Sequence, residues 1–194
     1  MDNLTLKPCS AFGLETPTVV QIGPYRIAER LDVALASVAS RRDRAGDLAT
    51  AAHAAGIPLP EPARAAPGDP FSAFWVAPGM WFVEAPFDSH PDIAANLKTA
   101  LCDAASVTEQ TDAWVRFDLT APSLTPLLER LSNVDLDAVP VGYASRTVID
   151  HLGCYLVKRG QAEITLYGPR SSAKSLLHAL EVAAVVCVAA FPTN

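Results

Sequence analysis

The chain has 194 residues, of which 50% are hydrophobic and 19% are charged, and this balance favours a folded protein over a disordered one. Its length matches one ordinary domain or two small fused domains. The formal net charge of −6 gives no sign of the basic surface that a nucleic-acid backbone needs, so we expect no nucleic-acid partner.

The cysteines and the apolar segments predict a cytoplasmic protein with reduced thiols. There are four widely spaced cysteines, Cys9, Cys102, Cys154 and Cys187. They lack the paired spacing of a zinc site or a disulfide framework. Residues 1–10 lack the charged and apolar regions of a signal peptide. The apolar stretch Leu176–Phe191, interrupted by His178 and Glu181, is shorter than the roughly 20 residues that span a bilayer, so we expect no membrane anchor.

Residues 1–70 predict an arm, a strand or helix, a second helix and a loop. Residues 1–25 contain several Pro and Gly breaks, which favour an extended N-terminal arm. Val33–Val38 suits a strand, although its alanines are equally compatible with a helix. Asp43–Ala55 is typical of a helix that stops at Gly56, and the following stretch, 58–70, is a proline-rich loop.

The next segment predicts a hairpin and a helix. Phe71–Val76 and Met80–Glu84 are aromatic-rich and are joined by a Pro-Gly turn, which indicates antiparallel strands. Ser89 and Asp92 resemble a capping box, and an apolar stripe follows them. We expect a helix from there to about residue 102.

Strict alternation in Ala113–Leu119 predicts a strand with one wet face. Val115, Phe117 and Leu119 fall on one side of this strand. Arg116 and Asp118 fall on the other side. Because both are charged, this second side is expected to face solvent.

The last third predicts a helix, three strands and a final helix. Leu124–Leu131 has a leucine stripe, and a proline stands near its first turn. Ser145–His151, Tyr155–Lys158 and Glu163–Tyr167 suit strands, separated by glycines. Ser171 is expected to cap the last helix. The whole order predicts an α+β fold of two consecutive split-βαβ-like units, with a mixed or antiparallel sheet and a pseudo-duplication at about 26–110 and 111–194.

No motif for catalysis or cofactor binding occurs, so we expect no catalytic, cofactor-binding or metal residues in this chain. Neither a dinucleotide fingerprint nor a phosphate-binding loop is present, and the four histidines are scattered. Ser171 and Lys174 match S-x-x-K, but the accompanying motifs of those acyl-transfer enzymes are missing, and a helix cap is the better interpretation. Asp135 and Asp137 are interpreted as a solvated turn rather than an acid/base pair.

His151 and Cys154 allow a thiolate–imidazolium pair in principle, but ordinary strand residues are the better interpretation. Gly153-Cys154-Tyr155 is similar to the K-G-C-Y-x-G-Q signature of a folate-binding family related to the glycine-cleavage T-protein. The residues on both sides depart from it, because His151-Leu152 precede it and Leu156-Val157 follow it.

From about residue 26 onward the sequence resembles the gamma subunit of heterotetrameric sarcosine oxidase. The resembling segments are DVALASVASRRDR (32–44), WVAPGMWFVEAP (75–86), ASVTEQTDAWVRFDLTAPSLTPLLERLSNVDL (105–136), SRTVIDHLGCYLVKRG (145–160) and GPRSSAKSLLHAL (168–180). This resemblance implies a 26–194 domain with a fold similar to the folate-binding domain of the T-protein. It also implies a non-catalytic accessory subunit that docks on the alpha subunit and stabilises a complex that demethylates sarcosine oxidatively to glycine.

In that family the large alpha and beta subunits hold FAD, FMN, NAD and tetrahydrofolate, and the small delta subunit holds a metal, so the resemblance implies no cofactor in this chain. Two alternatives stay open. One is a free-standing folate-binding one-carbon transfer protein of the T-protein type. The other is the small subunit of a related N-methyl amino acid dehydrogenase. The apolar end of the last helix fits either a docking helix or a core helix.

Overall fold

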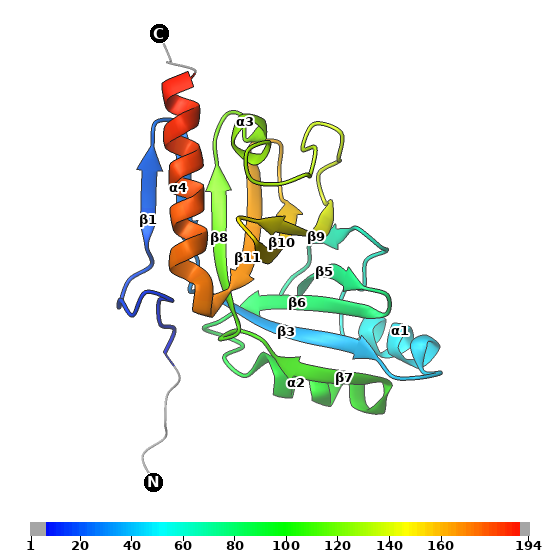
Figure 1. Ribbon diagram of the computed structural model, residues 1–194. Helices are drawn as coiled ribbons and strands as arrows, with labels where there is room; N and C mark the ends of the chain where they lie inside the picture. Colours follow the sequence, from blue (N-terminus) through cyan, green and yellow to red (C-terminus); the bar gives the residue numbers. More distant parts are fainter. Residues whose placement is uncertain (1–6, 191–194) are drawn as a thin grey trace.

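A computed structural model describes residues 7–190 and contains two antiparallel β-sheets (Figure 1). Sheet A has the strand order β1 (Val19–Ile22), β2 (Tyr25–Glu29), β8 (Trp114–Thr120), β11 (Glu163–Pro169), β10 (Leu152–Lys158), β9 (Ala144–Ile149). Sheet B has the order β4 (Ala65–Ala66), β5 (Ser72–Ala77), β6 (Met80–Pro86), β3 (Val33–Ser40), β7 (Ala105–Glu109). The mixed α+β class predicted from the sequence is confirmed.

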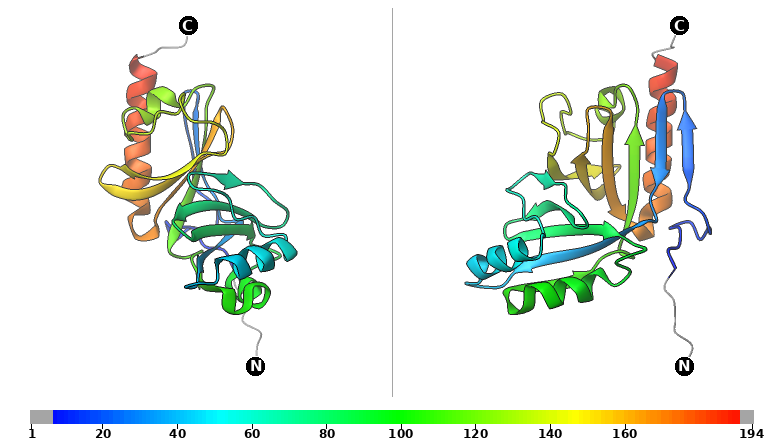
Figure 2. Two further views of the ribbon diagram at one scale, coloured as in Figure 1. Left: turned by 90° about the vertical axis from the view of Figure 1, so that its right-hand side faces the viewer. Right: turned by 180° about the vertical axis from the view of Figure 1, so that it is seen from behind.

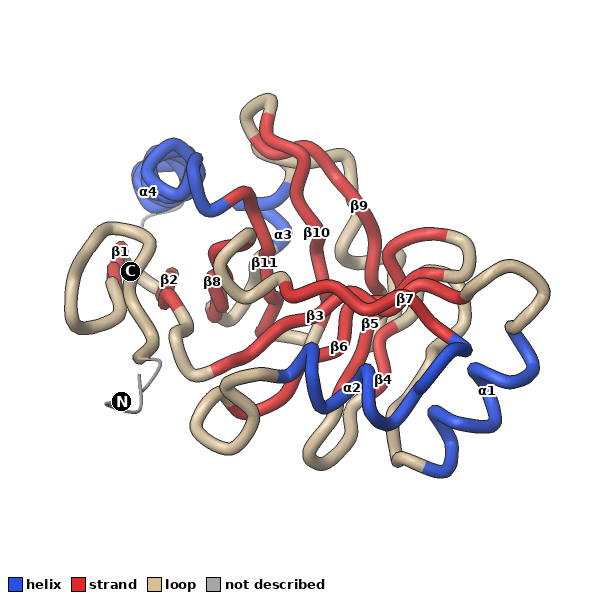
Figure 3. The backbone as a smooth tube through the Cα atoms, turned by 90° about the horizontal axis from the view of Figure 1, so that it is seen from below, coloured by secondary structure: helices blue, strands red, loops and turns tan. Residues whose placement is uncertain are grey.

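Helices cover the outer faces of both sheets, so the fold has four layers (Figures 2 and 3). The helices are α1 (Ala45–Ala54), α2 (Ile93–Leu101), α3 (Thr125–Leu128) and α4 (Ala173–Ala190), and the 3-10 turns are η1 (Cys102–Ala104) and η2 (Arg170–Ser172). One core lies between α4 and sheet A, and a second lies between sheet B and the pair α1 and α2. A third, aromatic-rich core joins the inner faces of the two sheets.

Strand β3 shows why its segment was ambiguous in the sequence. It is an interior strand of sheet B, between β6 and β7, and the five residues 34–38 are all buried. A strand covered on both faces has no polar side, so its sequence loses the two-residue alternation that identifies a half-buried strand. The strand interpretation is confirmed, and the helical alternative is wrong.

Several elements follow the prediction closely. The hairpin of β5 and β6 has the predicted turn, with Gly79 at a φ of +67°. Helices α1 and α2 fall inside the predicted ranges. The start of α2 lies three residues later than the capping box at Ser89 predicts, because Asp92 is itself the N-terminal cap and its carboxylate accepts the Ala95 backbone N–H at 3.1 Å. The last strand of sheet B ends at Glu109 and β8 of sheet A begins at Trp114, but β2, from the first predicted unit, also belongs to sheet A. The duplication itself stays a prediction.

Three local predictions differ from the structure. Residues 19–29, partly assigned to the arm, form the β1–β2 hairpin at one edge of sheet A, while residues 1–6 of the arm lie outside the described residues. The predicted helix Leu124–Leu131 is one short α-helical turn, α3, because the backbone N–H groups of Arg130 and Leu131 bond to carbonyls three residues back instead of four, and the chain leaves the helix by Ser132. Ser171 lies in η2 and does not cap α4.

Candidate functional site

A buried carboxylate joins the two sheets. Glu84 stands on β6, its side chain is only 4% exposed, and it faces sheet A. Its carboxylate accepts hydrogen bonds from Arg159 Nη2 at 2.6 and 2.9 Å and from Arg116 Nη1 at 3.1 Å. The hydroxyls of Tyr167 and Ser72 also donate to it. Four donors around one buried carboxylate compensate the cost of removing its charge from water.

The network continues from Glu84 through Arg116 to the surface. Arg116, on β8, donates to Asp118 two residues along the same strand at 2.9 and 3.0 Å. Asp118 also accepts from Thr165 Oγ1 at 2.7 Å and from Arg30 Nη1 at 3.1 Å. Arg30 is partly exposed and also pairs with Asp32, so the network ends in solvent.

The prediction that the charged side of β8 faces solvent is therefore wrong. Arg116 and Asp118 do lie on the same side of the strand, but that side faces sheet B, and their side chains are only 14% and 6% exposed. Two opposite charges two residues apart on one face satisfy each other, so the charged face stays buried. The sequence does contain a sign of a buried acidic partner for Arg116, because Glu84 is the single acid within the apolar strand MWFVEAP.

The charges of the network are fixed at ordinary pH. Burial alone raises the pKa of Glu84, but the guanidinium groups of Arg159 and Arg116 outweigh it and lower the pKa to about 2. Burial and the nearby Glu84 carboxylate raise the pKa of Tyr167 far above its usual range. Glu84 therefore stays ionised and Tyr167 stays neutral, which suits a structural role and not proton transfer.

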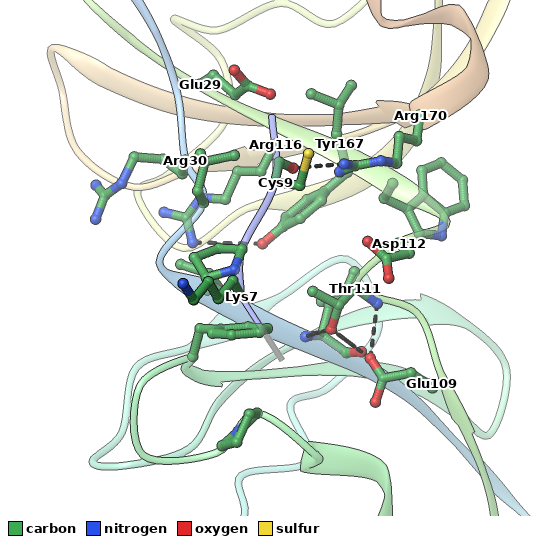
Figure 4. A pocket seen from close by; sticks show the side chains of 18 of the residues that line it. Lys7, Cys9, Glu29, Arg30, Glu109, Thr111, Asp112, Arg116, Tyr167 and Arg170 are labelled. Carbon is green, nitrogen blue, oxygen red and sulfur yellow. Dashed lines mark hydrogen bonds between the residues drawn. The ribbon is translucent and has the colours of Figure 1, made fainter. Parts of the chain in front are cut away.

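A cavity of about 350 Å³ opens beside this network (Figure 4). Its wall includes Arg116 and Tyr167 of the network, Trp114 and the partly exposed Arg170. Lys7, Pro8 and Cys9 also line it, because the N-terminal segment of the described chain runs across the cavity (Figure 4). The chain's own N-terminal segment therefore forms part of the wall of this cavity.

The N-terminal segment is held by a second buried carboxylate. Glu29 is 2% exposed at the end of β2 and accepts from Ser10 Oγ at 2.8 Å, Ala11 N at 2.7 Å and Thr18 N at 2.9 Å. Arg170 Nη2 adds a hydrogen bond to the carbonyl oxygen of Cys9 at 2.6 Å. This contact is not predictable from the sequence, because the donors are backbone and small polar groups that carry no recognisable pattern.

The two residue pairs considered as catalytic candidates in the sequence, Ser171 with Lys174 and His151 with Cys154, do not form an active site in the structure. Ser171 and Lys174 are both exposed, at the start of the last helical segment. His151 is exposed in the β9–β10 turn, whereas Cys154 is fully buried in β10, and burial raises the pKa of its thiol to about 11. A thiol with this pKa is protonated at neutral pH and is not a nucleophile.

The turn between β9 and β10 does not lie at Gly153, where the sequence predicted that the two strands are separated. It consists of Asp150 and His151, both at positive φ, while Gly153 pairs with Val148 inside the sheet.

The exposed Asp135 and Asp137 belong to a solvated turn as predicted: Asp135 accepts two backbone N–H groups, and Asp137 accepts from Thr125 Oγ1. Among residues 7–190, no group of three His, Cys, Asp or Glu side chains is placed to hold a metal ion.

Comparison with known proteins identifies the fold. The chain is similar to a chain of the heterotetrameric sarcosine oxidase from Corynebacterium sp. U-96 in complex with pyrrole 2-carboxylate, with a TM-score of 0.72, 18% identity and 86% coverage of both chains. Equal coverage means that the two chains have nearly equal length. No family model matches the sequence. No curated protein matches it.

A second likeness is to the glycine cleavage system aminomethyltransferase T from Bartonella henselae, with a TM-score of 0.57 and 13% identity. The match covers 76% of this chain but only 43% of that protein. The chain therefore has a fold found in sarcosine oxidase and in the T-protein, and spans less than half the length of the latter. The fold similarity predicted from the sequence is confirmed.

Proposed function

We propose that this chain is a non-catalytic, gamma-type accessory subunit of a complex like heterotetrameric sarcosine oxidase, and that it docks on the large alpha subunit and stabilises the assembly. This proposal is supported mainly by the structural similarity to a chain of heterotetrameric sarcosine oxidase, which extends over most of both chains and involves a chain of nearly equal length. In this proposal the complex works in the cytoplasm, and its flavins, NAD and tetrahydrofolate are held by other subunits.

The geometry of the buried network supports a structural role. Glu84, Arg116 and Asp118 satisfy one another's charges, and each connects strands of the two sheets or neighbouring strands of one sheet. An acid or base in catalysis needs a pKa near the working pH and access to a substrate proton. The Glu84 carboxylate, with its pKa held at about 2 inside the protein, meets neither condition.

A second candidate is a folate-binding one-carbon transfer protein, which the T-protein fold and the cavity favour. The cavity combines the arginines Arg30, Arg116 and Arg170 with the aromatic Trp114 and Tyr167, a lining that suits an aromatic ligand with carboxylates. Against this candidate, the N-terminal segment already occupies part of the wall, and Arg116 is fully committed to Glu84 and Asp118.

Co-expression with the alpha subunit tests both candidates. We expect the chain, itself colourless, to co-elute with a yellow flavin-containing complex in size-exclusion chromatography, and the isolated chain to show no heat of binding with tetrahydrofolate in calorimetry. A monomer that ignores the alpha subunit and binds tetrahydrofolate would establish the one-carbon protein instead. If the complex forms but oxidises N-methylglutamate and not sarcosine, the chain is the small subunit of the related dehydrogenase.

A further inference from the structure

Helix α4 has two apolar faces, and only one of them is covered. The covered face packs on sheet A through Leu176, Leu180, Ala184 and Cys187. The opposite face is exposed, and no element lies beyond it on the outer side of the molecule (Figure 2). A surface helix of a free-standing protein normally carries charged residues there, but α4 has none after Glu181.

The exposed residues of α4 follow the spacing of a helix–helix contact. The positions lie alternately three and four residues apart and are Ser175, His178, Val182, Val185 and Ala189. The valines are 50% and 55% exposed, and the adjacent Val186 is 40% exposed. Ser175 and His178 are polar, so the apolar part of this stripe is Val182, Val185 and Ala189 in the last turns of the helix. A 3-4 repeat of apolar side chains on one face is the pattern that packs against a second helix.

Two adjoining hollows extend this face beyond the helix. The first, of about 400 Å³, lies between Val182 and Val186 of α4, the loop residues Arg130 and Leu131, and Asp150 of the β9–β10 turn. The second is lined by the same Arg130 and Leu131 and continues to Val148 on β9, which is 58% exposed. The second hollow is lined mostly by polar residues, Glu129 and Arg146 among them, and Leu131 and Val148 are its large apolar residues. The surface from α4 to the edge strand of sheet A therefore joins exposed valines with polar and charged groups.

The rim of this surface carries unused charges. Within residues 7–190, neither the Arg130 guanidinium nor the Asp150 carboxylate takes part in any ion pair or side-chain hydrogen bond of the structure, although many other charged side chains do. An apolar centre with an open rim of both charge signs is the usual anatomy of a protein–protein contact. Charges of this kind select a partner that carries the complementary charges at the same positions.

We propose that this surface, the outer face of α4 with its two hollows, is where an amphipathic helix of the alpha subunit docks, with an acidic residue opposite Arg130 and a basic residue opposite Asp150. The proposal rests on the proposed function and adds the surface and the kind of partner. From Ser175 to Ala189 the exposed stripe is about 21 Å long, at 1.5 Å per residue, which accommodates four turns of a partner helix.

A second copy of the chain or a lipid surface fits less well. The net charge of −6 opposes both self-association and approach to an anionic membrane. The two hollows and the charged rim instead match a partner that extends beyond α4.

The test compares single substitutions in the co-expressed complex. Val185→Glu and, separately, Arg130→Glu are expected to weaken binding to the alpha subunit by at least about 10-fold, measured as Kd by biolayer interferometry. The matched control is Val141→Glu, at a valine of similar exposure, 47%, that lines neither hollow, and it should change Kd less than about 2-fold. Circular dichroism melts confirm that each variant folds.

The outcomes separate the two proposals. If the wild-type chain does not bind the alpha subunit, the proposed function fails. If it binds and both Val185→Glu and Arg130→Glu bind as well as wild type, the complex stands but this surface is not its contact. Wild-type dimerisation lost in Val185→Glu, or sedimentation of the wild type with phosphatidylglycerol vesicles, would likewise overturn the assignment of an alpha-subunit helix to this face.

Discussion

The guanidinium group of Arg159, at the end of β10, donates to both carboxylate oxygens of Glu84 on β6, at 2.6 and 2.9 Å. The two residues are 75 positions apart in the chain and belong to different sheets. Since the surrounding third core is aromatic and aliphatic, this pair fixes how the two sheets sit on each other, and its loss leaves an uncompensated charge in the interior.

Glu84→Gln is expected to lower the free energy of unfolding by about 3–5 kcal/mol, because Arg116 and Arg159, whose side chains are largely removed from solvent, both lose their carboxylate partner. Urea unfolding followed by tryptophan fluorescence measures the change. Glu163→Gln is the control, since Glu163 is exposed at the start of β11, and it should stay within about 0.5 kcal/mol of wild type. An equal loss in both variants would refute a special role for the buried pair.

The double variant Glu84→Met, Arg159→Met refines this test. Removing both members of the pair avoids the unpaired charge, so the double variant should lose less stability than the sum of the two single variants, by at least about 1 kcal/mol. Arg116 keeps Asp118 as its partner in this background. Strict additivity of the two single changes would show that the pair is not coupled.

The same carboxylate predicts how stability depends on pH. The pKa of Glu84 is about 2 in the folded protein and near 4.5 in the unfolded chain, so the unfolded state takes up a proton first as the pH falls. The stabilisation is therefore complete above about pH 5 and is lost between pH 4.5 and 2, amounting to on the order of 3 kcal/mol. Wild type should show a steeper loss of stability in this window than Glu84→Gln, and parallel curves would contradict it.

Helices, strands and turns with a clear sequence pattern were predictable, but the burial of their faces was not. The hairpin of β5 and β6 depends on local turn chemistry, so the sequence shows it directly. The start of α2 was predictable only to within three residues, because Ser89 and Asp92 are both good capping residues and the structure uses Asp92. The strand β8 was predicted in the right place, but its charged face was assigned to solvent. Alternation tells which residues share a face, whereas only the packing of sheet B on sheet A decides which face is buried.

The edge of sheet A and the N-terminal contact were hidden for a related reason. Strand β1 is only four residues long and is half exposed, so it lacks the apolar alternation that identifies a strand. The partners of Glu29 are mostly backbone N–H groups of the N-terminal segment, which every sequence has. The burial of acids such as Glu84 and Glu29 can therefore be recognised only once the structure shows which groups donate hydrogen bonds to them.

Glu29→Gln is expected to loosen the N-terminal segment. A Gln side chain has one accepting oxygen and one donating NH₂ group, so at least one of the Ala11 and Thr18 backbone N–H groups loses its acceptor. Hydrogen exchange at these two amides should accelerate about 10- to 30-fold, as expected for the loss of a charged hydrogen bond. Glu15→Gln, at an exposed residue of the same segment, is the control, and similar rates in both variants would disprove the contact.

Gly168 on β11 lies directly beneath α4, and its replacement by alanine is expected to destabilise the protein. An added Cβ would come within 2.4 Å of Leu176 Cδ2, a side chain that is fully buried and has little room to move. Such overpacking costs about 1–3 kcal/mol. Gly160→Ala is the matched control, because the nearest atom to its Cβ is Glu163 Cβ at an ordinary 3.7 Å, so little change is expected. Thermal unfolding of both variants compares them, and a Gly168→Ala melting temperature equal to that of Gly160→Ala would mean that α4 does not pack on β11 at this position.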